Sequence, residues 1–396
     1  MSPELYLREA SLPEALEPGM EAIGVCSEAI GLMARKMRHF VFMARDLDPR
    51  GANILKQEML AVGAEAAISY HAISDLTKPT DCLLSGTERQ FGIALRKLEK
   101  QPFGLRELAS ELDGAMRVLL GPAPQSFGTL RLDRTRVMGI LNVTPDSFSG
   151  DGISDPALAA ERALAMEKEG ADIIDIGGES TRPGAEPVSP KEETARVVPV
   201  IKALSGILRI PISIDTRKQQ VAEAALKAGA SVVNLVGGIR DKRMAEMLAW
   251  KGAPVILMHM QGEPSNMQDS PQYRDVMDDI VSELRVQVRL ATDAGIDPGK
   301  IAIDPGIGFG KTAGHNLEIL GRLGELRVLG LPVLVGASRK SFIGKVLDAE
   351  VGHRLEGSIA AAVLAAANGA QIVRAHDVAA TVRALKVADG IGRIGL

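Results

Sequence analysis

The sequence has few of the features on which disulfide-rich, secreted and membrane-spanning proteins depend. Cysteine occurs only twice, as Cys26 and Cys82, which cannot form a disulfide framework, so we expect reduced thiols. The longest apolar run, Ile359–Ala367, has about half the length of a membrane span. The N-terminus also lacks the basic region and long apolar stretch of a secretion signal. We therefore expect a cytoplasmic protein with no membrane partner.

Neither sign of charge dominates the composition. The chain has 46 Lys and Arg residues against 50 Asp and Glu residues, which gives a formal net charge of −4. This balance predicts no nucleic-acid partner and no surface for an anionic membrane. Four histidines show no metal-ligand spacing, namely His39, His71, His315 and His353. A structural zinc site is therefore not expected.

What the sequence does contain is one unit repeated eight times between Arg136 and Asp377. Each unit is a short β-branched apolar run that ends in polar residues and is followed by a helical stretch. The runs are Val137–Val143, Asp172–Gly177, Ile210–Thr216, Ser231–Val236, Pro254–Met260, Lys300–Gly306, Pro332–Ser338 and Ala370–Asp377. Parallel strands that are buried on both faces read as continuous apolar runs. The repeat therefore predicts an α/β fold, a (β/α)8 TIM barrel whose working face lies at the C-terminal ends of the strands.

Local signals mark several helix ends between these runs. Asp155-Pro156 and Ser189-Pro190 have the composition of helix starts. Three glycines are predicted to end helices, namely Gly170, Gly229 and Gly369. Helices are thus expected where the barrel pattern needs them.

The repeat leaves the first part of the chain unexplained, because a minimal barrel needs only about 250 residues. We predict a smaller α+β domain over residues 1–120, a linker rich in Gly and Pro over residues 121–126, and the barrel over residues 127–396. In the first domain we expect helices at 23–35, 52–62, 88–100 and 105–120 and strands at 39–43 and 65–69. Residues 127–134 are predicted to form a hairpin that closes the bottom of the barrel. No cluster of carboxylates, cysteines or histidines recurs in residues 1–120, so the expected role is support of packing or of a dimer.

Six motifs near the strand ends identify a family. They are Met138-Gly-Ile-Leu-Asn-Val-Thr-Pro-Asp-Ser-Phe-Ser149, Asp175-Ile-Gly-Gly-Glu-Ser-Thr-Arg-Pro-Gly184, Ser213-Ile-Asp-Thr-Arg217, Asp304-Pro-Gly-Ile-Gly-Phe-Gly-Lys-Thr312, Gly336-Ala-Ser-Arg-Lys-Ser-Phe-Ile-Gly344 and Val373-Arg-Ala-His-Asp-Val378. In this order they resemble dihydropteroate synthase, over about residues 127–392. The resemblance implies a homodimeric, Mg²⁺-dependent transferase of folate biosynthesis with small-molecule substrates. It would join (7,8-dihydropterin-6-yl)methyl diphosphate to 4-aminobenzoate and release diphosphate and 7,8-dihydropteroate.

A pterin ring presents an edge of alternating hydrogen-bond donors and acceptors, so its pocket needs carboxylates and amides on rigid strands. Such side chains end three predicted strands, and a lysine follows a fourth. A single Asp at such a place could simply cap the next helix, but the whole set favours a pocket. The resemblance implies six pterin-binding residues: Asp215, Asn234, Met258, Asp304, Phe309 and Lys340.

The last predicted strand carries groups suited to a diphosphate. Arg374 and His376 are two residues apart and therefore share a face of the strand. An arginine can bind phosphate oxygens with two parallel hydrogen bonds, whereas His376 alone would read as a structural histidine. The resemblance implies that Arg374 and His376 bind the diphosphate. It also implies Asn142 as the protein contact to a Mg²⁺ that binds the diphosphate oxygens, in line with the few protein ligands that Mg²⁺ takes.

Two segments that follow predicted strands, Thr144–Gly152 and Ser180–Pro187, are rich in Gly, Pro, Ser and Asp. Segments of this kind can close over a substrate. The resemblance implies that they help to form the aminobenzoate site. The corresponding residues are Phe148, Thr181, Arg182, Pro183 and Ser341.

The catalytic residues that the resemblance implies are Asp215, Lys340, Arg374 and His376. Diphosphate would leave while the pterin methylene becomes cationic, Asp215 would stabilise that charge, and the aromatic amine would attack without a covalent enzyme intermediate. Two alternatives are a pterin-dependent methyltransferase with the same barrel and a non-catalytic pterin-binding paralogue. Neither needs the diphosphate-binding groups, which this sequence retains.

The chain departs from the family pattern at two places. Ser149-Gly-Asp-Gly152 stands where Ser-Asp-Gly-Gly is usual, which moves the carboxylate of that segment to Asp151. Asn234-Leu235 replaces a common Asn-Asp pair. Because alternate strand residues face opposite sides, we expect Leu235 to affect the support of the pocket rather than pterin contact.

Overall fold

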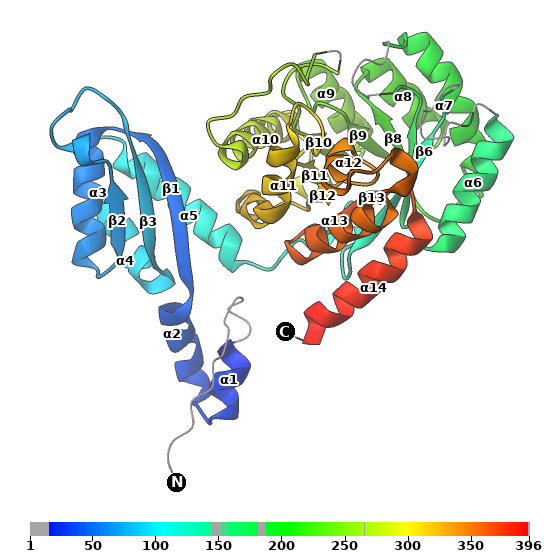
Figure 1. Cartoon of the computed structure of the whole chain (residues 1–396). Coiled ribbons are helices and arrows are strands. Elements are labelled where there is room, and N and C mark those ends of the chain that lie inside the picture. Colours follow the sequence, from blue (N-terminus) through cyan, green and yellow to red (C-terminus); the bar gives the residue numbers. More distant parts are fainter. Residues whose placement is uncertain (1–15, 145–152, 154, 181–186, 265, 395–396) are drawn as a thin grey trace. The chain divides into compact units, whose positions relative to one another are not determined.

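The computed structural model describes residues 16–144, 153, 155–180, 187–264 and 266–394. The chain divides into two compact units, one on the N-terminal side of Gly121 and one over Pro122–Arg393 (Figure 1). Each unit has an apolar core of its own.

The N-terminal unit contains three antiparallel strands and several helices. Its elements are α1 Leu16–Ala22, α2 Ser27–Met37, β1 His39–Leu47, α3 Pro49–Ala61, β2 Glu65–Ile68, the 3-10 turn η2 Tyr70–Ala72, β3 Thr80–Thr87, α4 Glu88–Leu98 and α5 Leu105–Leu120. The sheet order is β1-β3-β2, with β3 in the centre. Side chains alternate along β3, where Cys82 and Leu84 are buried and Leu83 is exposed. The buried ones join side chains of α3, α4 and α5 in one core.

Most elements predicted for this unit are confirmed, with shifts of a few residues at their ends. The helix predicted at 23–35 is wrong at its start, because residues 23–26 separate α1 from α2. The sequence does not predict β3. This strand contains Gly86 and exposes Leu83, which weakens the alternation and composition by which a half-buried strand is recognised.

The second unit is the predicted barrel, in which each of the eight apolar runs overlaps a strand. The strands are β6 Arg136–Asn142, β7 Ile173–Gly177, β8 Ile212–Thr216, β9 Val232–Leu235, β10 Val255–Met258, β11 Ile301–Asp304, β12 Leu334–Val335 and β13 Ile372–Ala375. All are parallel, in the order β11-β10-β9-β8-β7-β6-β13-β12. A parallel bridge between Ile303 and Val333, with a 2.8 Å hydrogen bond from Ile303 N to Pro332 O, closes the ring.

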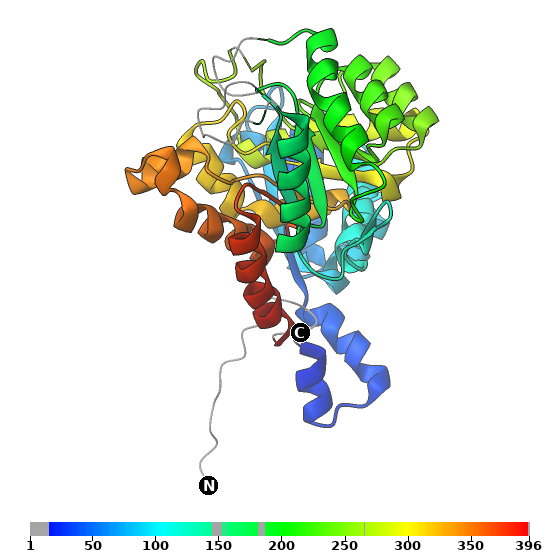
Figure 2. The ribbon, with the colours of Figure 1, turned by 90° about the vertical axis from the view of Figure 1, so that its right-hand side faces the viewer.

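Helices surround the barrel strands on the outside, as Figure 2 shows for the green segments. They are α6 Pro156–Glu169, α7 Pro190–Leu204, α8 Gln219–Ala228, α9 Lys242–Lys251, α10 Val276–Asp293, α11 Ala313–Gly321, α12 Ser341–Leu347, α13 Leu355–Ala367 and α14 Val378–Ile394. Three 3-10 segments accompany them, η3 Pro298–Lys300, η4 Leu323–Leu329 and η5 Val351–His353. No helix in the described parts of the chain is long and apolar enough to cross a membrane.

The predicted helix signals act as caps. The Asp155 and Ser189 side chains accept hydrogen bonds from backbone N–H groups at the starts of α6 and α7, and a proline follows each. Gly170 and Gly229 end α6 and α8 with positive φ angles of 103° and 123°. Gly369 follows α13 by two residues.

A hairpin closes the N-terminal end of the barrel, as predicted. Its strands are β4 Ser126–Phe127 and β5 Leu130–Arg131. Phe127 and Leu132 pack in one cluster with inward-facing side chains of the barrel strands: Met138, Ile173, Val232, Ile256, Ala302, Leu334 and Ile372. Apolar side chains therefore fill the lower part of the barrel, and the polar side chains lie above them, toward the C-terminal ends of the strands.

Candidate active site

Polar residues form a row across the C-terminal ends of four neighbouring strands. In the sheet register Asn142 pairs with Gly177, Gly177 with Asp215, and Asp215 with Asn234. A Cβ added at Gly177 would lie 3.6 Å from Asp215 Cβ and 3.9 Å from Asn142 Oδ1. Glycine therefore leaves open the space between the carboxylate and the amide.

Asp175 lies one row below and joins three strands. Its Oδ2 accepts hydrogen bonds from Arg374 Nε at 2.6 Å and from Asn234 Nδ2 at 3.0 Å. Arg374 Nη2 also donates to Asp215 Oδ2 at 2.6 Å. Asp175 is fully buried, and the side chains of Asp215 and Arg374 are 16% and 18% exposed. The guanidinium thus stands between two carboxylates inside the barrel.

This arrangement changes the acidity of Asp215. Burial raises the pKa of Asp215 to about 7, because lost solvation, with repulsion from Asp175 and Glu193, outweighs the attraction of Arg374 and Lys340. Asp215 can therefore change its charge near neutral pH.

Several buried acceptor atoms in this layer have no hydrogen-bond partner among the described residues: Asp175 Oδ1, Asp215 Oδ1, Asn234 Oδ1 and Ser213 Oγ. Buried polar atoms in folded proteins are nearly always hydrogen-bonded. The four atoms lie on three adjacent strands, β7, β8 and β9. This part of the barrel is suited to a polar ligand that supplies several donors.

The opposite wall contains Asp304 at the end of β11 and Lys340 before α12. Burial raises the pKa of Asp304, against the attraction of Lys340. Burial lowers the pKa of Lys340 to about 8, against the attraction of Asp304 and Asp215. Lys340 Nζ lies 4.6 Å from the centre of the Phe309 ring, and Phe309 packs in one apolar cluster with Met258. Lys340 therefore lies close enough to Asp304 and Asp215 to interact with both charges, and its ammonium group also lies over the Phe309 ring.

The two groups predicted for the diphosphate differ in their surroundings. Arg374 reaches the carboxylates Asp175 and Asp215, whereas His376 Nδ1 contacts Ser338 Oγ at 3.0 Å. Arg374 is therefore part of the buried cluster of Asp175 and Asp215, in addition to any role in binding an anion above that cluster. Ser341 is the exposed first residue of α12.

The described metal candidate at this face is a single side chain. Asn142, at the end of β6, is half-buried and offers a single amide oxygen. Among the residues that the structure describes, no group of three or more His, Cys, Asp or Glu side chains could hold a metal ion. An amide oxygen is nevertheless a fitting ligand for Mg²⁺, which takes oxygen ligands and keeps several waters.

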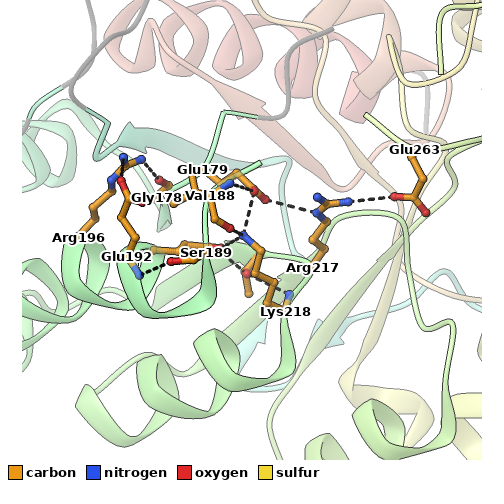
Figure 3. Close-up of polar contacts among 11 residues, drawn as sticks. Gly178, Glu179, Val188, Ser189, Glu192, Arg196, Arg217, Lys218 and Glu263 are labelled. Atoms are coloured by element: carbon orange, nitrogen blue, oxygen red, sulfur yellow. Dashed lines mark hydrogen bonds and ion pairs between the residues drawn. The ribbon is translucent and has the colours of Figure 1, made fainter. Parts of the chain in front are cut away.

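The segment after β7 is anchored at both described ends by Lys218 (Figure 3). Lys218 Nζ donates to Glu179 Oε1 at 2.8 Å, to Val188 O at 2.6 Å and to Glu193 Oε2 at 2.6 Å. Glu193 is completely buried and also accepts from Thr216 Oγ1 at 2.6 Å. All three donors of the ammonium group are thereby used.

Figure 3 also shows that Arg217 links this cluster to the segment after β10. Its guanidinium contacts Glu179 at 3.4 Å and Glu263 at 2.9 Å. The predicted residues Phe148, Asp151, Thr181, Arg182 and Pro183 lie outside the described residues.

In the sequence Asp175 is recognisable only as the start of a motif, and its contacts with Arg374 and Asn234 are not predicted. One signal was available, because Asp175 precedes Gly177 by two residues and so shares its face of β7. Nothing in the sequence pattern indicates the partners of Lys218. The departure at Leu235 is explained by its packing, since Leu235 is buried in the outer apolar core while Asn234 faces Asp175.

Known proteins share both this barrel and its sequence. The family model described as "Pterin binding enzyme" matches residues 138–376, more than half of the chain. The dihydropteroate synthase of Escherichia coli is 46% identical over 262 residues, which are 66% of this chain and 93% of that protein. This chain belongs to the dihydropteroate synthase family of pterin-binding enzymes. The family fold, a barrel preceded here by a smaller α+β unit, agrees with the predicted fold class.

Two further members of the family are informative. The dihydropteroate synthase from Xanthomonas albilineans, solved in complex with 7,8-dihydropteroate, is 41% identical with a TM-score of 0.59, and the match covers 66% of this chain and 95% of that one. A probable bifunctional folylpolyglutamate synthase/dihydropteroate synthase of Haloferax volcanii is 42% identical over 353 residues. That match covers 86% of this chain, so it extends beyond the barrel into the N-terminal unit, but only 42% of the Haloferax protein.

Proposed function

We propose that this chain is a dihydropteroate synthase, a transferase of folate biosynthesis. It condenses (7,8-dihydropterin-6-yl)methyl diphosphate with 4-aminobenzoate and gives 7,8-dihydropteroate and diphosphate. The observation that carries the proposal is the layer of buried acceptors on β7, β8 and β9, faced across the barrel by Asp304 and Lys340. Such a layer can accept hydrogen bonds from the donor groups on the edge of a pterin ring.

In the proposed complex Asp215, Asn234 and Asp304 bind the pterin edge. Met258 and Phe309 cover the ring with apolar surface, and Lys340 approaches it over Phe309. Asp175 holds Asn234 and Arg374 in place through the bonds at 3.0 and 2.6 Å. Asp175 is therefore proposed as a positioning residue, a role that its place in the sequence motif does not indicate.

Arg374 and His376 bind the leaving diphosphate at the C-terminal end of β13. Asn142 would hold Mg²⁺ together with diphosphate oxygens, and the bound ion would offset the charge that develops on the leaving group. Ser341 begins α12 beside Lys340. It is proposed to contact the aminobenzoate, together with Phe148, Thr181, Arg182 and Pro183.

The reaction breaks the bond between the pterin methylene and a diphosphate oxygen, and the electron pair leaves with the diphosphate. Arg374 and His376 stabilise the departing negative charge. The carboxylate of Asp215 stabilises the positive charge that appears on the methylene and the ring. The amine of 4-aminobenzoate then forms the new carbon–nitrogen bond and loses a proton. No covalent link to the enzyme is needed.

The proposal includes a cytoplasmic homodimer in which residues 1–120 form a separate supporting domain, joined to the barrel at 121–126. Two observations support the separate domain. The N-terminal unit has its own apolar core, and the match to Escherichia coli dihydropteroate synthase covers 93% of that protein but only 66% of this chain.

The purified chain tests the function directly. With both substrates and Mg²⁺ it should release diphosphate and form dihydropteroate, and Asp215→Ala or Lys340→Ala should each reduce the rate at least about tenfold without unfolding the protein. Absence of dihydropteroate formation by the folded wild-type chain would refute the proposal. Methyl transfer to a corrinoid acceptor instead would support the methyltransferase alternative.

A further inference from the structure

The segment between β11 and α11 has an unusual feature. Four successive backbone carbonyl groups, those of residues 307–310, each accept a hydrogen bond from a different side chain. Lys340 donates to Ile307 O, Gln268 to Gly308 O at 2.8 Å, Lys311 to Phe309 O at 2.9 Å, and Tyr273 to Gly310 O at 2.7 Å. The N–H of Gly308 in turn donates to Asn316 Oδ1 at 2.6 Å.

The donors come from three separate parts of the barrel unit. Gln268 and Tyr273 precede α10, Lys311 directly follows the segment, and Lys340 precedes α12. Lys311 is 3% exposed, and its Nζ lies 2.9 Å from Nδ1 of His259, which is 2% exposed. A chain segment whose four carbonyl groups are all bonded by side chains, three of them from other parts of the barrel unit, has little freedom to change its path.

Close packing against the backbone after β10 also restricts the path of this segment. Gly306 and Gly310 have positive φ angles of 68° and 60°. A Cβ added at Gly306 would lie 1.9 Å from His259 O, and one at Gly310 would lie 2.4 Å from Gln261 O. The segment therefore rests directly on the backbone that follows β10, and only glycine allows this approach.

The immobilised segment carries Phe309, whose ring lies beneath Lys340 Nζ at 4.6 Å. We propose that Tyr273, Gln268 and Lys311 are positioning residues for the pterin. They fix the backbone of residues 307–310 so that Phe309 and Lys340 stand in their binding geometry before the ligand arrives. The inference rests on the proposed function, because the ligand that Phe309 and Lys340 would meet is the pterin of that proposal.

The chemistry of the donors agrees with this role. Burial, with the nearby charges of Glu283 and Asp279, raises the pKa of Tyr273, so its hydroxyl keeps the proton that it donates. A binding surface fixed before binding loses less conformational freedom when the ligand arrives. Loosening the segment should therefore weaken pterin binding without changing the chemical step.

The test uses the full chain and two conservative variants. Tyr273→Phe removes one hydroxyl, and Gln268→Leu removes the donor to Gly308 O at an exposed position. Each should raise the KM for the pterin diphosphate and the Kd for free pterin about fivefold, the effect expected for one lost hydrogen bond. The KM for 4-aminobenzoate and kcat should change less than about twofold. Tyr70→Phe, at a tyrosine that is 90% exposed, is the matched control. It should leave the KM for the pterin diphosphate and the Kd for free pterin unchanged.

A double-mutant cycle identifies the route of the effect. In a Phe309→Ala background the additional effect of Tyr273→Phe on pterin binding should be smaller than in the wild-type background, because one of the two groups that it positions is gone. A lowered melting temperature with unchanged Kd for pterin would show purely structural contacts and overturn the inference. So would equal effects of Tyr273→Phe with and without the Phe309 ring. A wild-type chain that binds pterin but makes no dihydropteroate would instead refute the proposed function, and the Kd measurements would still decide the inference.

Discussion

At the scale of single residues, Asp215 and Lys340 have pKa values shifted toward neutrality from opposite sides. Burial raises the pKa of Asp215 to about 7 and lowers that of Lys340 to about 8. Asp215 is charged above the first value, and Lys340 is charged below the second. Both charges are therefore present together only in a narrow range.

We predict a bell-shaped dependence of kcat/KM on pH, with its maximum between about pH 7 and 8. Activity should fall on the acid side because protonated Asp215 no longer stabilises the cationic methylene, and on the alkaline side because Lys340 loses its charge. Steady-state rates across this range provide the measurement. The much weaker Asp215→Asn enzyme should lack the acid limb, and its persistence in that variant would contradict the assignment.

Arg374 and His376 should respond differently to replacement, although the sequence predicts one role for both. His376→Ala should weaken binding of the pterin diphosphate much more than binding of free pterin, because the imidazole serves the diphosphate. Arg374→Ala should weaken both ligands and also lower the free energy of unfolding by about 3 kcal/mol, because it leaves Asp175 and Asp215 buried without their cation. Calorimetric titrations and denaturation measure these effects. Identical ligand profiles for the two variants would contradict the prediction.

At the scale of elements, Lys218 connects the described ends of the segment after β7 to β8 and α7. Lys218→Met should lower the free energy of unfolding by at least about 3 kcal/mol, because Glu193 would keep a fully buried carboxylate without its ion pair. Lys242→Met is a matched control at a lysine whose side chain is 82% exposed, and it should change stability by less than about 0.5 kcal/mol. Urea denaturation of both variants provides the comparison. Similar losses of unfolding free energy in the two variants would mean that the ion pairs in Figure 3 contribute little to stability.

The turn after β11 provides a second prediction at this scale. Gly306→Ala would place a Cβ 1.9 Å from His259 O at a φ of 68°. Gly295 has a φ of 97° but nothing within 4 Å of such a Cβ, so Gly295→Ala isolates the backbone strain. We expect Gly295→Ala to cost about 1 to 2 kcal/mol of stability and Gly306→Ala to cost clearly more. A lower melting temperature for Gly295→Ala than for Gly306→Ala would contradict the close contact between residue 306 and His259 O.

At the scale of the whole molecule, the described groups of the proposed site lie in the barrel unit. A chain beginning at Pro122 should therefore fold and retain Mg²⁺-dependent synthase activity within about tenfold of the full chain, with a changed stability or oligomeric state. Kinetics and light scattering of the shortened chain provide the test. If this chain bound pterin normally but could not condense it with 4-aminobenzoate, the N-terminal unit would have to act in the second-substrate step.

The sequence predicted the barrel and the strand ends because these depend on local patterns. Buried parallel strands require continuous apolar runs, and such runs were visible at all eight places. The dependence on local patterns also explains why the prediction for the N-terminal unit was incomplete. The strand β3 has a mixed pattern, and its place in the centre of the sheet depends on pairing with β1 and β2 rather than on its own residues.

The local sequence pattern is enough to place six polar side chains at the C-terminal face: Asp215, Asn234, Asp304, Lys340, Arg374 and His376. Which of them interact depends on the closed barrel. Arg374 and Asp175 are 199 residues apart and meet because the barrel closes. The side chains of Gln268, Tyr273 and Lys340, which bond carbonyl groups of residues 307–310, likewise come from parts of the chain outside that segment. Local patterns determine where a strand ends and on which face of the strand a side chain lies. The partner of that side chain across the barrel depends on closure and packing of the whole ring.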